Sequence, residues 1–123
     1  MARYRVTASA QADIIGILAH TEAHFGEAAR LRYERLIATA IRDIAGDPTR
    51  PGTLDREELG PNARTWHLRA SRERARTEAG VVRRPRHLLL FRIEADGLVV
   101  IGRVLHDAME LDRHLPTERG WLS

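Results

Sequence analysis

The sequence predicts an α+β fold of two layers, in which a helical hairpin packs on a small, mainly antiparallel sheet in the order β-α-α-β-β-β. Two observations carry this prediction. Residues 10–25 and 29–44 repeat apolar side chains every three or four positions, as helices do, and only a short joint separates them. Residues 88–93 and 98–105 are short, nearly continuous runs of Leu, Ile, Val and Phe, as expected of central strands.

The N-terminal half supplies one strand and both helices. Residues 3–8 alternate and contain β-forming side chains, so they predict the first strand. Ser9 is a suitable N-cap for the first helix, which should end at Gly26. The second helix should end at Gly46-Asp47-Pro48, because proline cannot continue a helix. The short joint between the two helices predicts an antiparallel pair.

The C-terminal half supplies the remaining strands. Residues 49–62 are rich in proline and glycine and predict a loop, with one helical turn at 54–59. The alternating residues 65–69 predict a strand. Residues 71–86 contain six arginines and predict an exposed basic loop. The turn at 95–97 contains an Asp-Gly step, whose glycine accepts the positive φ that a tight strand connection needs.

A chain of 123 residues has room for one core rather than two. We therefore expect a single domain over 1–123, with its core at about 3–116 and a short tail at 117–123. Within this core, Ile41 and Leu90 are expected to face each other across the helix–sheet interface. The segment Asp107–Glu110 resembles a capping box and predicts a short helical turn after the last strand.

Composition narrows the class of protein. The chain has no cysteine, which excludes disulfides and thiolate metal sites and favours a reducing, cytoplasmic compartment. It shows neither a signal-peptide core nor an apolar run of membrane-spanning length. All 20 basic residues are arginine, so no lysine acid, base or Schiff-base amine is available. The net charge of +3 is too small by itself to indicate a nucleic-acid partner.

Two blocks of the C-terminal half carry a resemblance to a known family. Arg83–Arg92 has the sequence RRPRHLLLFR, and Ile101–Met109 has the sequence IGRVLHDAM. With these blocks and its order of elements, the chain resembles the RelE/ParE superfamily of type II toxins over about residues 3–116. The Arg-Val-Leu-His ending of the second block resembles the ParE branch. The family fold implied is a helix pair on a mainly antiparallel sheet.

This resemblance implies the toxin component of a type II toxin–antitoxin system. Most ParE-like toxins act on DNA gyrase, so the implied activity is direct binding to gyrase, which blocks replication, arrests growth and serves plasmid maintenance. The implied partner is a ParD-like antitoxin whose tail wraps the toxin in a hetero-oligomer. No cofactor or metal is implied. RelE-like toxins instead cleave mRNA on the ribosome, so an mRNA endonuclease is the alternative, and a plain binding module remains a third.

Candidate residues follow from these alternatives. For binding the target or the antitoxin, the candidates are the arginines of the basic loop and one methionine after the last strand: Arg72, Arg74, Arg83, Arg84, Arg86 and Met109. For a nuclease, which needs cations and an acid–base group, the candidates are Arg69, Arg92, Arg103 and His106. Cleavage is disfavoured, because the chain lacks lysine and its tyrosines belong to the first strand and to the apolar stripe of the second helix.

Two histidine patterns have competing interpretations. His106 ends a strand beside Asp107, where it suits either acid–base chemistry or a structural hydrogen bond that closes the strand. His20 and His24 are spaced as a helical metal pair. No third ligand can be placed beside that pair, so the sequence predicts no metal site.

Overall fold

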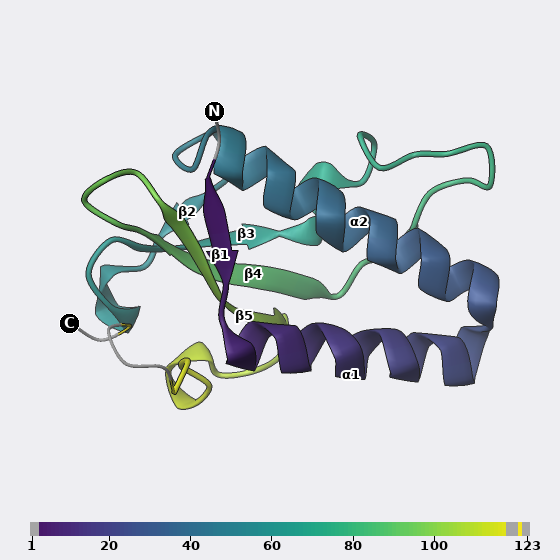
Figure 1. Cartoon of the computed structure of the whole chain (residues 1–123). Coiled ribbons are helices and arrows are strands. Elements are labelled where there is room, and N and C mark those ends of the chain that lie inside the picture. Colours follow the sequence, from purple (N-terminus) through teal and green to yellow (C-terminus); the bar gives the residue numbers. More distant parts are fainter. Residues whose placement is uncertain (1–2, 118–120, 122–123) are drawn as a thin grey trace.

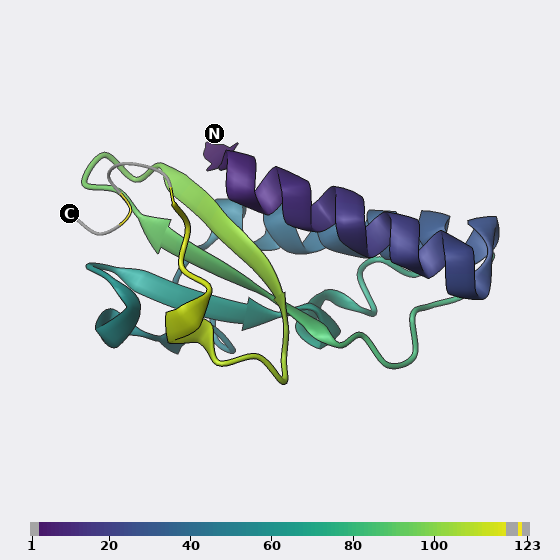
Figure 2. The ribbon, with the colours of Figure 1, turned by 90° about the horizontal axis from the view of Figure 1, so that it is seen from below.

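The computed structural model describes residues 3–117 and 121. Its helices and main strands are β1 (Tyr4–Val6), α1 (Ala8–Phe25), α2 (Glu27–Gly46), β2 (Leu54–Asp55), β3 (Ala63–His67), β4 (His87–Ile93) and β5 (Val99–His106). Short 3₁₀ helices lie at Glu57–Leu59, Leu68–Ser71 and Leu111–Arg113. The helices lie side by side across the sheet and form one layer, with the sheet as the other (Figures 1 and 2). The predicted α+β fold is confirmed.

The five strands form one sheet in the order β1-β5-β4-β3-β2. All neighbours are antiparallel except β1 and β5, which run parallel, so the sheet is mixed. The first strand therefore lies beside the last one, and the helical hairpin connects β1 to the strands on the other side of β5. Among the described residues, neither helix is long and apolar enough to cross a membrane.

The first helix begins earlier than predicted. Its N-cap is Thr7 rather than Ser9: the Thr7 hydroxyl accepts a hydrogen bond from the Ala10 N–H at 3.1 Å. The same hydroxyl donates to the Gly102 carbonyl at 2.8 Å, and the Thr7 N–H donates to the Ile101 carbonyl at 3.0 Å. Thr7 thus ends β1, caps α1 and joins both to β5, which a local cap preference could not indicate.

Three further local predictions need correction. The predicted turn at 54–59 is helical only at its end, because Leu54 and Asp55 pair with β3. Strand β3 ends at His67, whose Nδ1 accepts the Arg69 N–H at 3.1 Å, so Arg69 lies in a 3₁₀ helix rather than a strand. The predicted capping box is wrong, since the Asp107 carboxylate instead contacts distant side chains.

The two faces of the sheet carry separate apolar clusters. The cluster between the helices and the sheet contains Ala10, Tyr33, Leu36, Ile37, Ala40, Ile41, Ile44, Trp66, Leu68, Ala75, Leu89, Phe91, Val99, Ile101 and Val104. The opposite face holds Leu59, Ala63, Leu90, Val100, Leu105, Leu111 and Trp121, so Leu111 and Trp121 cover the strands on this side. The predicted contact between Ile41 and Leu90 is therefore wrong. Successive residues of a strand point to opposite faces, so Phe91 and Leu89 face the helices and Leu90 faces away.

The ladder between β4 and β5 contains one irregularity. Leu90 pairs with Arg103 and Phe91 pairs with Ile101, which leaves Gly102 without a partner on β4. A Cβ atom on Gly102 would lie 2.6 Å from Pro116 Cγ and 2.7 Å from a ring carbon of Trp121, so only glycine fits there. Beyond this bulge the register is shifted by one residue, and His106 instead of Leu105 lies opposite His87.

Candidate partner-binding groove

A groove of about 1260 Å³ opens where the helical hairpin extends beyond the sheet. One wall consists of α1 and α2. The second wall is the segment 76–86, which runs beside α2 in Figure 1. The C-terminal end of β5 closes the inner end. The basic loop predicted from the sequence is thus one wall of a groove.

The groove combines apolar and basic side chains. Its apolar lining includes Ile17, Phe25, Ala29, Val82 and Met109, and Phe25 is 72% exposed despite its size. Its arginines are Arg32, Arg76, Arg83, Arg84, Arg86 and Arg103. An exposed apolar lining bordered by cations is suited to an amphipathic, acidic partner.

The basic loop is anchored at its start by Asp43 of α2. The carboxylate of Asp43 accepts the Ser71 hydroxyl at 2.6 Å and the Arg74 guanidinium at 2.8 Å. The Ser71 hydroxyl in turn accepts the indole N–H of buried Trp66 at 2.9 Å. Arg74, a predicted binding residue, is therefore ion-paired within the protein and does not line the groove.

The loop is anchored at its other end by Asp107. Arg86 donates to this carboxylate at 3.0 Å, and His67 Nε2 lies 3.0 Å from its second oxygen. The Asp107 N–H also donates to the Arg86 carbonyl at 2.8 Å. The hydrogen bonds from His67 and Arg86 hold the pKa of Asp107 below its usual value. The two carboxylates Asp43 and Asp107 thus position the basic wall against the helices and the sheet.

A cluster of acid–base groups lies at the inner end of the groove. The Tyr33 hydroxyl is 2.6 Å from His87 Nδ1, and the His87 and His106 rings meet edge to face with centroids 5.5 Å apart. Burial raises the pKa of Tyr33 to about 12. Burial also lowers the pKa of His87 to about 4, and the neighbouring His106 adds to that effect. His87 is therefore neutral at pH 7.

Of the residues in this cluster, only His106 was a candidate from the sequence. His87, Tyr33, His67 and the bridging role of Asp107 were not predicted. The available signal was positional: His67 ends β3, His87 begins β4 and His106 ends β5, so the three residues meet at one edge of three neighbouring strands. Using that signal requires the strand order and the bulge at Gly102.

The predicted binding residues mostly gather at the groove. Arg83 and Arg84 line it, are exposed, and have no ion-pair partner among residues 3–117 and 121. Met109 lines it as well and is 44% exposed. Arg72 instead donates to the Arg83 carbonyl at 2.8 Å, which holds the two ends of the basic loop together.

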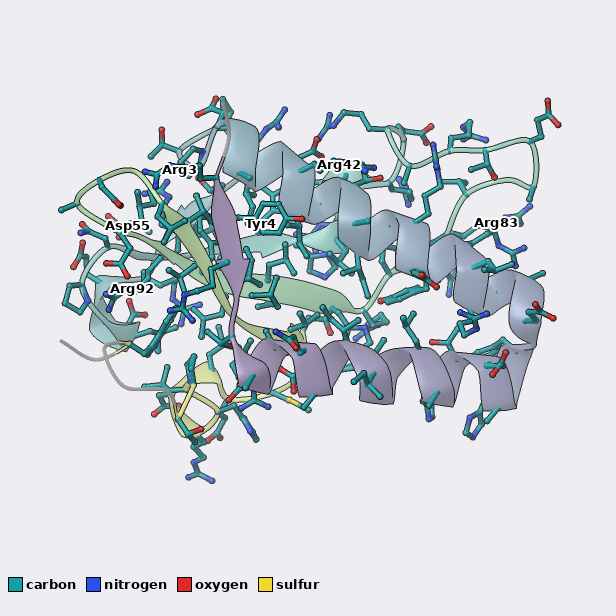
Figure 3. The ribbon with its side chains drawn as sticks, in the orientation of Figure 1. Arg3, Tyr4, Arg42, Asp55, Arg83 and Arg92 are labelled. Carbon is teal, nitrogen blue, oxygen red and sulfur yellow. The ribbon has the colours of Figure 1, made fainter. Side chains whose placement is uncertain are left out.

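The four nuclease candidates do not meet at one point. Arg92 is 9% exposed and donates to the Trp121 carbonyl at 2.7 Å, at the opposite end of the molecule from Arg83 (Figure 3). Arg103 is held by Asp13 of α1 at 2.7 Å and 2.8 Å. Arg69 is exposed on its 3₁₀ helix. Of these four residues, His106 is the one whose ring contacts His87, which is hydrogen-bonded to Tyr33.

The described part of the chain contains no group of three or more His, Asp or Glu side chains arranged to hold a metal ion. The rings of His20 and His24 stack with centroids 4.0 Å apart, and His24 Nδ1 lies 2.9 Å from the His20 carbonyl. One ring nitrogen of His24 is therefore already used within α1.

The depressed pKa of His87 predicts a pH-dependent stability. Between pH 6.5 and about 4, the unfolded chain binds a proton that folded His87 does not, so stability should fall as the pH falls through this window. The variant His87→Gln should show a smaller change in urea midpoint between pH 7 and pH 4.5 than the wild type. The exposed His24→Gln variant is the control and should keep the wild-type dependence. Identical pH dependence for wild type and His87→Gln would contradict the burial of a neutral His87.

The sequence and the fold were each compared with known proteins. The family model described as "ParE toxin of type II toxin-antitoxin system, parDE" matches residues 4–111. Seven chains of solved structures also match. One is from the "Chromosomal ParDE TA system from P. aeruginosa", with a TM-score of 0.63 and 18% identity, over 86% of this chain and 96% of that chain. At that identity the likeness shows the fold alone. No curated protein matched the chain.

The family assignment rests on the sequence match, and the fold agrees with it. The matched residues include β1, both helices and the whole of the β4–β5 ladder, so they contain the groove and both anchors of the basic loop. The predicted resemblance to the ParE branch is thereby confirmed. The chain belongs to the ParE toxin family of type II toxin–antitoxin systems.

Proposed function

We propose that this toxin inhibits DNA gyrase by direct binding, without catalysing a reaction, and so blocks replication and arrests growth in the cytoplasm. The observation that carries the proposal is the concentration of charge on one groove wall. Residues 76–86, which form this wall, contain four arginines and one glutamate, a net of +3 that equals the net charge of the whole chain. The remainder of the chain is therefore neutral overall. A basic wall beside exposed apolar side chains favours binding by surface complementarity.

We further propose that a ParD-like antitoxin neutralises the toxin by placing its tail in the groove, within a toxin–antitoxin hetero-oligomer. An acidic, partly disordered tail would fold on binding, with apolar side chains on Ile17, Phe25 and Val82 and carboxylates toward Arg83 and Arg84. Since target and antitoxin would use the same wall, occupancy by one excludes the other. Such a pair serves plasmid maintenance when plasmid loss ends antitoxin supply.

One observation favours a second candidate function, ribosome-dependent cleavage of mRNA. His106 lies beside His87, which is hydrogen-bonded to Tyr33, so an acid and a base are within reach of the same groove. Against it, Arg92 lies outside the groove and donates to the Trp121 carbonyl, and Arg103, which lines the groove, is already paired with the Asp13 carboxylate.

Charge reversal of the groove wall tests the gyrase proposal. The double variant Arg83→Glu/Arg84→Glu should inhibit gyrase supercoiling at least tenfold less well, since hydrogen bonds to charged groups contribute roughly 1.5–3 kcal/mol each. The matched control is Arg35→Glu/Arg42→Glu, which reverses two exposed α2 arginines that do not line the groove. The control should retain wild-type inhibition. Equal inhibition by both double variants would remove the basic wall from the mechanism.

A second variant separates gyrase binding from RNA cleavage. His106→Gln keeps much of the size and hydrogen-bonding capacity of histidine, so a gyrase-binding toxin should keep most of its toxicity. Loss of a general acid or base would instead lower a nuclease rate by about 10²–10⁴-fold. The measurements are gyrase supercoiling and primer extension on ribosome-bound mRNA. Unperturbed gyrase, together with mRNA cuts that vanish in His106→Gln, would promote the nuclease.

A further inference from the structure

The hydrogen bonds around His87 determine which of its ring nitrogens carries the proton. The Tyr33 hydroxyl accepts the Arg86 N–H at 3.3 Å, so its own proton is free to be donated. Its nearest acceptor is His87 Nδ1 at 2.6 Å. In the neutral ring this leaves the proton of His87 on Nε2.

The other two histidines of the cluster reach the same tautomer. His106 Nδ1 accepts the Ala108 N–H at 3.1 Å, and His67 Nδ1 accepts the Arg69 N–H at 3.1 Å. Each neutral ring therefore carries its proton on Nε2. His67 uses that donor on Asp107 at 3.0 Å.

The Nε2–H groups of His87 and His106 have no acceptor among residues 3–117 and 121. Both residues line the inner end of the groove, their rings lie 5.5 Å apart, and the His106 side chain is 39% exposed. The carboxylates nearby are already committed, Asp107 to His67 and Arg86, and Asp13 to Arg103 and the backbone of β5. The Nε2–H groups of His87 and His106 are therefore two hydrogen-bond donors of groove-lining residues, without an acceptor in the described part of the chain.

We propose that His87 and His106 form a carboxylate-binding subsite at the inner end of the groove, which accepts one acidic side chain of the antitoxin tail. This inference rests on the proposed role of the groove as the antitoxin's site. The occupant follows from charge: the arginines of the groove favour an acidic segment, and a carboxylate offers two oxygens to two separate N–H donors.

The subsite makes antitoxin binding depend on protons. The titratable and charged groups around His87 are Tyr33 of α2, His67 of β3, Arg86 before β4, His106 and Asp107 at the end of β5, and Asp13 of α1. A bound carboxylate adds a negative charge beside the two histidines and raises the pKa of His87 above its value of about 4 in the free protein. The complex then binds more protons than the free toxin at pH values just above 4, so affinity should increase as the pH falls from 7 to 5.

The proposal is tested with designed peptides, because charge and helical amphipathicity are the two features that the groove should select. A fluorescent 16-residue peptide carries leucines on one helical face and glutamates on the other, and a second peptide carries glutamines in place of the glutamates. Binding is measured by anisotropy at pH 7, 6 and 5. The variant His87→Leu/His106→Leu removes both N–H donors of the subsite, and His24→Leu/His114→Leu, two histidines that do not line the groove, is the matched control.

The double subsite variant should bind the glutamate peptide about tenfold less tightly than wild type, as for loss of hydrogen bonds to a charged group. It should also lose the increase in affinity at low pH, whereas the control keeps both. The glutamine peptide should show no pH dependence with any variant. Wild-type affinity and pH dependence in the double subsite variant would overturn the subsite and leave the groove as the antitoxin's site. Failure of the glutamate peptide to bind wild-type protein would overturn the groove assignment as well.

Two further measurements guard against a misfolded double variant. Single His106→Leu changes only the ring that is not hydrogen-bonded to Tyr33, and should still weaken binding of the glutamate peptide severalfold. In the folded wild type, ¹⁵N shifts of the histidine rings should show protonated Nε2 in both His87 and His106. A neutral ring that carries its proton on Nδ1, in either residue, would overturn the subsite independently of any variant.

Discussion

Replacement of Leu90 by alanine is expected to destabilise the protein by roughly 2–5 kcal/mol, the cost of a large-to-small change in a packed core. Leu90 is fully buried on the sheet face away from the helices, with Val100, Leu105, Leu111 and Trp121 as neighbours in its cluster. These neighbours are held by the strands and by the C-terminal segment, so they can close the resulting cavity only partly. Urea unfolding monitored by circular dichroism measures the loss.

A double-mutant cycle checks which face each residue occupies. Ile41→Val removes one methylene on the helix face and should cost about 0.5–1.5 kcal/mol. Its effect should add to that of Leu90→Ala within about 0.5 kcal/mol, because the two side chains lie on opposite faces of the sheet. Val100→Ala lies in the same cluster as Leu90 and should show a coupling of at least about 0.5 kcal/mol. Strong coupling between Leu90 and Ile41 would restore the contact that the sequence predicted.

Removal of the Asp13 carboxylate is the second large change. Its oxygens accept the Arg103 guanidinium at 2.7 Å and 2.8 Å and the Val104 N–H at 2.9 Å, so it attaches α1 to β5. The Asp13 and Arg103 side chains are only 14% and 21% exposed. Asp13→Ala should therefore cost about 2–4 kcal/mol, somewhat less than the roughly 3–5 kcal/mol of a fully buried broken pair.

The ion pair between Asp13 and Arg103 also affects how Arg103 variants are interpreted. Arg103→Ala should also lower the free energy of unfolding, so a loss of toxicity in that variant need not report catalysis. Asp13→Asn is the matched control: it keeps an oxygen acceptor for the Val104 N–H while losing the charge, and should fall between wild type and Asp13→Ala. Wild-type urea midpoints for Asp13→Ala would show that the α1–β5 contact is held by packing alone.

Local patterns in the sequence were sufficient for the helices and the central hairpin. The apolar repeat of α2 predicts a stripe that includes Leu36, Ile37 and Ile44, and all three are buried. The runs that became β4 and β5, and the Asp-Gly turn between them, were likewise predicted within a few residues. These features depend on neighbours close in the chain, which is why periodicity and turn chemistry reveal them.

The basic loop was predicted as an exposed, arginine-rich segment, and its length and charge are as expected. Its position as a groove wall could not be inferred, because it depends on Asp43 and Asp107, which are distant in the sequence from the residues they hold. Nor could the sequence show which arginines are free. Arg74 and Arg86 form ion pairs with Asp43 and Asp107, whereas Arg83 and Arg84 line the groove and are exposed.

The sequence by itself therefore determined the elements, the family resemblance and the basic character of residues 71–86. The tertiary structure alone decided that His106 faces His87. In a regular ladder Leu105 would lie there, and the one-residue shift arises at Gly102, where Pro116 and Trp121 leave no space for a side chain. A shift of one residue in register exchanges the two faces of a strand, so contacts with residues far along the chain decide whether His106 or Leu105 lies opposite His87.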